Sequence, residues 1–158
     1  MRTTFLFLAI AISLRIGLFY AGVALPGFTF GFVLLGFVVL LAFLSGFFEL
    51  NEEPNAPMPA LFRAGLRSTA VFALLYACFT YLFFHVINTQ EFPTRIDAMV
   101  KEAVATGNPE ALVRERLNAF FNPGKYAFMT FIGLLSMGAL NALLFAIVHH
   151  KFLRRLRG

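Results

Sequence analysis

The 158-residue chain is 59% hydrophobic and only 13% charged, with 22 Phe, no Trp and a mean hydropathy of +0.79. Soluble domains carry about 25% charged residues, and roughly 55–60% of any folded surface is already apolar, so this composition excludes a soluble domain and predicts an integral membrane protein. The net charge of +5 does not indicate nucleic-acid binding, because the basic residues gather at the ends of apolar runs and in a short tail.

Four apolar runs are each about 20 residues long, the length at which a helix crosses some 30 Å of hydrocarbon. They cover residues 3–25, 28–48, 68–87 and 126–148. Lipid offers no partner to bare backbone groups, so these runs are expected to be helices. The predicted fold class is therefore all-α: a polytopic membrane protein, a single domain over residues 1–158, with four transmembrane helices in a bundle.

Prolines punctuate this pattern, since all seven lie outside the apolar runs. Pro26-Gly27 predicts a tight antiparallel hairpin between the first two spans, and Pro59 is placed to begin a helix that runs into the third span. Carriers that bind substrate at broken helices tend to have Gly or Pro interruptions inside their spans. The unbroken runs therefore count against such a carrier.

The long connection over residues 88–125 is expected to hold two short amphipathic helices. The apolar face of the first consists of Ile96, Met99, Val100 and Val104, and that of the second consists of Val113, Leu117, Phe120 and Phe121. Thr106-Gly107 predicts a helix stop with Gly in the left-handed conformation. Asn108 is expected to cap the second helix, with Pro109 at its first position. These helices either cap the bundle or dock a partner.

The distribution of basic residues predicts orientation. One side of the membrane would hold Arg2, Arg63, Arg67, Lys151, Arg154, Arg155 and Arg157. The other side holds five basic residues, diluted through the long connection and matched there by five acids. The positive-inside rule then predicts that both termini are cytoplasmic and that the connection faces outward. A cleaved signal peptide fits less well, because Arg15 interrupts the first apolar run.

Arg15 stands inside the first run, where an Arg costs about 2.5–3.5 kcal/mol on insertion scales. Small residues recur every four positions in that run: Ala9, Ser13, Gly17 and Ala21. At about 100° per residue, Arg15 falls nearly opposite this small face. A similar ladder in the last run consists of Gly138, Ala142 and Ala146. Small faces let helices approach closely in lipid, so both ladders are predicted to be packing seams.

The four runs contain no Asp or Glu that could pair with Arg15. Counting along the spans puts polar residues near its level: Tyr76, Thr80, Ser136 and Asn141. Arg15 either binds an anionic ligand or lipid headgroup, or it hydrogen-bonds within this cluster and fixes the helix register. Asn141 is also a candidate for an interhelical hydrogen bond.

No catalytic, cofactor-binding or metal-ligating motif is recognised, so no enzyme activity and no cofactor are predicted. His149 and His150 are adjacent, point about 100° apart, and are interpreted as membrane-interface residues. A lipid-modifying enzyme would need a carboxylate or metal cluster, but Glu49, Glu52 and Glu53 lack motif spacing. Cys78 is the only cysteine and is interpreted as a small hydrophobe.

Short motifs carry a family resemblance. The third span begins with Leu61-Phe62-Arg63-Ala64-Gly65-Leu66, the segment before the last span ends in Phe121-Asn122-Pro123, and the tail is basic. In these features the chain resembles the bacterial four-span membrane proteins grouped as domain of unknown function 4199, although NEEPNAPMP replaces their usual Gly-rich, aromatic second connection. The resemblance implies a small bacterial membrane protein, and it carries over no catalytic residue because the family has no established activity.

Two functions are compatible with these observations. The first is a non-enzymatic structural or accessory component of an inner-membrane assembly, as a homo-oligomer or in a larger complex, with membrane lipids as its other partners. The alternative is a small carrier or channel whose polar pocket surrounds Arg15. Missing intramembrane acids count against proton or sodium coupling.

Overall fold

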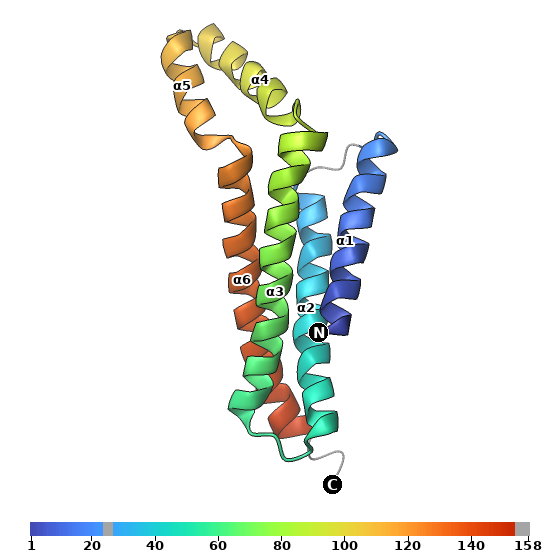
Figure 1. Ribbon diagram of the computed structural model, residues 1–158. Coiled ribbons are helices and arrows are strands. Elements are labelled where there is room, and N and C mark those ends of the chain that lie inside the picture. Colours follow the sequence, from blue (N-terminus) through green and yellow to red (C-terminus); the bar gives the residue numbers. More distant parts are fainter. Residues whose placement is uncertain (24–26, 154–158) are drawn as a thin grey trace. The chain divides into compact units, whose positions relative to one another are not determined.

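The computed structural model describes residues 1–23 and 27–153, and these residues contain helices and no strand. The helices are α1 (Arg2–Tyr20), α2 (Gly27–Glu52), α3 (Met58–Leu82), α4 (Glu91–Ala105), α5 (Glu110–Phe120) and α6 (Pro123–Val148) (Figure 1). Single π-helical turns continue two of them: η1 (Phe83–Ile87) after α3 and η2 (His149–Leu153) after α6. Four of these helical segments are long and apolar enough to cross a membrane, as expected from the sequence.

The spans differ from their predicted limits mainly at the ends. The third helix begins at Met58, ten residues before the apolar run, and Pro59 lies in its first turn as predicted. The second continues to Glu52 and the fourth begins at Pro123. These extensions are polar or proline-containing turns that a hydropathy pattern does not capture, because helix geometry does not require apolar residues.

The first span is shorter than predicted, since α1 ends at Tyr20 and not at residue 25. Gly22 adopts the left-handed conformation, with φ of 67°. The Gly22 and Val23 N–H groups donate to the carbonyls of Phe19 and Leu18, both at 3.1 Å. This is the Schellman pattern that closes helices at glycine. The predicted turn at Pro26 lies outside the described residues.

The chain divides into two compact units, one comprising Met1–Tyr76 with Phe131–Gly158 and the other Ala77–Thr130. Helices α3 and α6 contribute residues to both units. In the first unit, α2 contacts three other helices through its aromatic residues. Phe37 meets Phe7 of α1 at 5.4 Å and Phe72 of α3 at 6.5 Å between ring centroids. Phe43 meets Phe145 of α6 at 5.4 Å.

The second unit has its own apolar core around α4. Its buried residues are Phe83, Phe84, Phe92, Ile96 and Val100, with Val113, Leu117 and Phe121 of α5 and its C-cap packed against them. Three residues of the predicted apolar faces, Met99, Val104 and Phe120, are instead exposed. The apolar contact between α4 and α5 is therefore narrower than the sequence pattern indicated.

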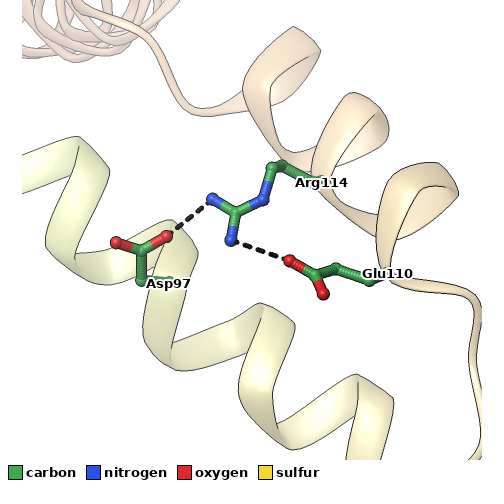
Figure 2. Close-up of polar contacts among 3 residues, drawn as sticks. All are labelled: Asp97, Glu110 and Arg114. Atoms are coloured by element: carbon green, nitrogen blue, oxygen red, sulfur yellow. Dashed lines mark hydrogen bonds and ion pairs between the residues drawn. The ribbon is translucent and has the colours of Figure 1, made fainter.

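An ion-paired arginine also joins α4 to α5. Arg114 of α5 donates hydrogen bonds to Asp97 of α4 at 2.6 Å and to Glu110 one turn earlier at 3.2 Å (Figure 2). The hydrogen bond to Asp97, followed by that to Glu110, raises the pKa of the guanidinium above its already high ordinary value. Arg114 therefore stays charged at every physiological pH, and both carboxylates are exposed, so the network orients the helices more than it stabilises them.

The turn between α4 and α5 confirms one prediction and corrects another. Gly107 has φ of 88° and closes α4, as Thr106-Gly107 predicted. Asn108, however, does not cap α5, whose N-cap is Pro109. The Asn108 side-chain amide donates to the Ala103 carbonyl at 3.2 Å, so it caps the end of α4 instead. An Asn between two helices can accept from the N–H groups that begin the second helix or donate to the carbonyls that end the first. Here the Asn108 amide donates to a carbonyl of α4.

Asn122, in contrast to Asn108, caps the beginning of the helix that follows it, α6. Its Oδ1 accepts a hydrogen bond from the Lys125 N–H at 2.9 Å, in the geometry of an N-cap, and Pro123 occupies the first helical position. The predicted break at Asn122-Pro123-Gly124 is therefore a two-residue junction between consecutive helices.

Candidate functional site

Arg15 lies on α1 with its guanidinium over the ring of Phe30, 5.2 Å from the ring centroid. A cation over an aromatic face is attracted by the ring quadrupole, by about 0.5–1 kcal/mol at exposed sites and more when desolvated. The side chain is half-buried. The sequence did not indicate Phe30, because depth was counted along the spans with the first span continuing to residue 25, whereas α1 ends at Tyr20.

The end of α1 changes the depth expected for Arg15. Arg15 lies only five positions before Tyr20, the last residue of α1, which is roughly 7.5 Å of axial rise. A long basic side chain this close to a span end can extend to the headgroup region. Arg15 is therefore closer to one end of its helix than the sequence indicated.

Tyr76 extends the aromatic contact from Phe30 toward α3. It is buried, and its ring stacks against Phe30 at 6.5 Å and against Phe72 at 5.9 Å. The structure thus connects Arg15 with Tyr76 through one intervening phenylalanine ring. This series of rings holds α1, α2 and α3 at a defined register.

The polar cluster predicted around Arg15 has three further members, two of which lie on α6. Thr80 is buried and belongs to the second unit. Ser136 is exposed on α6. Asn141 donates to the Met137 carbonyl of its own helix at 2.8 Å, and not to a neighbouring helix. Among the described residues, neither Ser136 nor Asn141 forms a hydrogen bond with Arg15.

The small ladder of α6 lies against α3. Gly138, Ala142 and Ala146 are all buried. A Cβ added at Gly138 would come within 2.6 Å of Thr69 Cβ and Oγ1, and one added at Gly65 would come within 3.0 Å of Ala142 Cβ. The two helices therefore approach so closely that a single methyl group does not fit.

The small ladder of α1 has a different position. Ala9, Ser13, Gly17 and Ala21 are all exposed, and a Cβ added at Gly17 would meet nothing within 4 Å. Helix α1 instead packs through Thr4 and Ala11, which are 1% and 0% exposed. As a seam within this chain, the predicted ladder of α1 is wrong, because the buried face of α1 is a different one.

His149 is buried within the protein. It is 0% exposed, its Nδ1 lies 2.5 Å from the Phe145 carbonyl, and its ring is 5.0 Å from that of Phe43. Gly46 provides the space, since a Cβ there would lie 3.1 Å from His149 Nδ1. In the described part of the chain, no group of three or more His, Cys, Asp or Glu residues could hold a metal ion.

Comparison with family models, with curated proteins and with solved structures finds no match to this chain. The resemblance to domain of unknown function 4199 therefore stays a prediction, based on the motifs around Phe62-Arg63 and Asn122-Pro123. Four apolar helices are compatible with an integral, multi-pass membrane protein.

Proposed function

We propose that this chain is a non-enzymatic accessory or self-associating protein of a bacterial inner membrane. Its four spans form a bundle, both termini are cytoplasmic, and α1 associates with a further transmembrane helix. The observation that carries this proposal is the small face of α1, which is exposed although the equivalent face of α6 is covered.

Burial supports this assignment of α1. Of the residues in its apolar part, 17% are buried, against 39% in the third span. Large apolar side chains accompany the small face, with Phe5 and Leu6 more than half exposed. In lipid, helices associate through close van der Waals packing, which small residues permit. A second α1, carrying the same ladder, would offer a self-complementary surface.

Orientation in the membrane is supported by basic residues at the ends of the spans. Arg2 begins α1, Arg63 and Arg67 lie in the first turns of α3, and Lys151 follows α6. Cytoplasmic ends of spans carry such an excess of Lys and Arg. On this topology, α4 and α5 face the opposite side of the membrane.

A carrier with a pocket around Arg15 has less support. The guanidinium faces the Phe30 ring, and Tyr76 stacks against that same ring and against Phe72. Ser136 is exposed and Asn141 bonds within its own helix. Ser136 and Asn141 therefore do not support a pocket around Arg15.

Membrane insertion is tested first, by alkaline carbonate washing of membranes. We expect the protein to remain in the pellet, and to present both of its ends to the same side when single cysteines near them are labelled in a Cys78→Ala background. Release by carbonate, or labelling of the two ends from opposite sides, would contradict the topology.

Association through α1 is tested by oxidative cross-linking in membranes. Ser13→Cys in the Cys78→Ala background should give a disulfide-linked pair of chains. Gly36→Cys is the matched control, because Gly36 is also exposed within a span and has no neighbour within 4 Å of an added Cβ. Equal cross-linking of both variants would indicate random collision. If neither variant cross-links and the purified protein is a single chain without a stoichiometric partner, the proposed association is wrong.

A further inference from the structure

A polar cavity of about 180 Å³ lies among α1, α2 and α3 in the first unit. Its wall includes Thr4, Ser45, Glu49, Glu52, Arg67 and Ser68. Pockets for drug-sized ligands measure about 300–1,000 Å³, whereas one water occupies about 30 Å³ in the liquid. The cavity therefore has room for a group the size of a lipid headgroup and not for a larger molecule.

The two most buried polar residues of the cavity wall carry hydroxyl groups. Thr4 and Ser68 are 1% and 7% exposed, and within the described chain neither hydroxyl forms a hydrogen bond. Thr69, the next residue, shows the contrast, because its hydroxyl bonds to the carbonyls of Gly65 at 3.0 Å and Leu66 at 3.1 Å. Neither hydroxyl oxygen is among the fully buried polar atoms that lack a partner in the described residues, so both oxygens are open to the cavity. Thr4 and Ser68 are thus available to a polar occupant.

Charged groups of both signs line the same cavity. Glu49 and Glu52 are three residues apart on α2 and so share one face of the helix. Glu49 is half-buried, whereas Glu52 and Arg67 are exposed and form the rim. Among the residues that the structure describes, the ion pairs all lie in α4 and α5. The two carboxylates and the guanidinium of the cavity therefore do not neutralise one another directly.

We propose that this cavity binds a primary ammonium joined to a phosphate ester, the headgroup of an ethanolamine phospholipid. The ammonium has three donors and no acceptor; it enters the cavity and donates to the Glu49 carboxylate and to the Thr4 and Ser68 hydroxyl oxygens. The phosphate stays at the rim, where Arg67 donates to it. Glu52, also at the rim, adds a second negative charge that favours a cationic group over an anionic one.

The charges disfavour other occupants of similar size. A purely anionic headgroup would meet two carboxylates. A divalent cation seeks six or more oxygen ligands and would meet the Arg67 guanidinium in the same wall. A choline headgroup carries the same charges as ethanolamine, but its methyl groups replace the N–H donors that the hydroxyls and Glu49 would accept. The site is therefore selective for the primary amine.

Native mass spectrometry of the delipidated full chain in detergent tests the proposal. Ethanolamine, choline and glycerol phospholipids of identical acyl chains are added in turn, and soluble phosphoethanolamine is titrated separately by calorimetry. We expect the ethanolamine lipid to bind about five- to tenfold more tightly than the choline lipid, the size expected from one or two charge-assisted hydrogen bonds. If soluble phosphoethanolamine binds as tightly as the ethanolamine lipid, the ligand is a free solute. If soluble phosphoethanolamine does not bind, the ligand is the lipid.

Matched variants separate the cavity from general surface charge. Glu49→Gln should reduce the preference to less than about twofold, and so should Thr4→Val or Ser68→Ala, which keep the charge. Glu53→Gln is the control, because Glu53 follows Glu52 in the chain but is not in the cavity wall. The proposal is overturned if the wild-type chain binds ethanolamine and choline lipids equally, or if Glu53→Gln loses as much preference as Glu49→Gln. These readouts do not depend on association through α1, and carbonate washing tests membrane insertion separately.

Discussion

Helices α1 and α6 carry the same small-residue pattern and use it differently. In α6, Gly138 lies against Thr69 and Ala142 against Gly65, so the ladder meets a neighbouring helix of this chain. In α1, the ladder that contains Ser13 and Gly17 is exposed. The comparison shows that a small face indicates how closely a helix can be approached, but not by which partner.

The partner is determined by the facing helix. In α3, Gly65 and Thr69 lie one turn apart and face α6. The Thr69 hydroxyl donates a hydrogen bond to the Gly65 carbonyl of its own helix, so it needs no partner on α6. Helix α1 is held from another side, where Phe7 meets Phe37 and Arg15 lies over Phe30. Its small face consequently stays available.

The largest expected effect comes from closing the α6 seam with one methyl group. Gly138→Ala would bring Cβ to 2.6 Å from Thr69 Cβ and Oγ1, and neither atom is the far end of a flexible side chain. Overpacking of this kind costs about 1–3 kcal/mol, which unfolding in a denaturing-detergent titration would measure. The control is Gly133→Ala on the same helix, which has no neighbour within 4 Å and should be neutral or slightly stabilising. Equal midpoints for the two variants would mean that α3 and α6 are not in close contact.

A smaller loss is expected at the next contact of the same seam. Gly65→Ala places Cβ 3.0 Å from Ala142 Cβ and 3.3 Å from its Cα, so the backbones must separate slightly. We expect a loss of about 1 kcal/mol, at the lower end of overpacking costs. Combining it with Ala142→Gly should restore part of the stability, because the methyl group then moves from one helix to the other. Additive losses in the double variant would show that the two residues do not oppose each other.

The contact between Arg15 of α1 and Phe30 of α2 should have a modest coupling energy. Arg15→Gln and Phe30→Leu each remove one partner of the cation–π contact, and a double-mutant cycle should give about 0.5–1 kcal/mol. Arg63→Gln, exposed at the start of α3, is the charge control. Binding of anionic lipids to Arg15→Gln should be measured in parallel. Unchanged binding together with a coupling to Phe30 would assign Arg15 a structural role, and strictly additive stability effects would exclude the contact.

These particulars show what the sequence could predict and what it could not. The four spans and the Gly107 stop depend on local properties, hydropathy and a left-handed glycine, and both were predicted. The stop at Gly22 was missed because apolar residues continue beyond it to Leu25. Because of that error, Arg15 was expected to lie further from the end of its span, and Phe30 was not recognised as its neighbour. The cavity beside Thr4 is lined by three helices, and the partner of each ladder lies on another helix. The residue pattern of one helix therefore predicts neither feature.

The smallest effect on stability, and the sharpest test of the comparison, is expected at Gly17. A Cβ at this position meets nothing within 4 Å, so Gly17→Leu should leave the unfolding midpoint unchanged or slightly raised, since Leu has the higher helix propensity. The same substitution should reduce association through α1, because a large side chain keeps another helix from approaching the small face. Gly36→Leu, on an exposed part of α2, should have the same small effect on the unfolding midpoint but should leave association through α1 unchanged. The proposed role of α1 requires this separation of stability from association: if Gly17→Leu leaves cross-linking at Ser13→Cys intact, the exposed ladder faces only lipid.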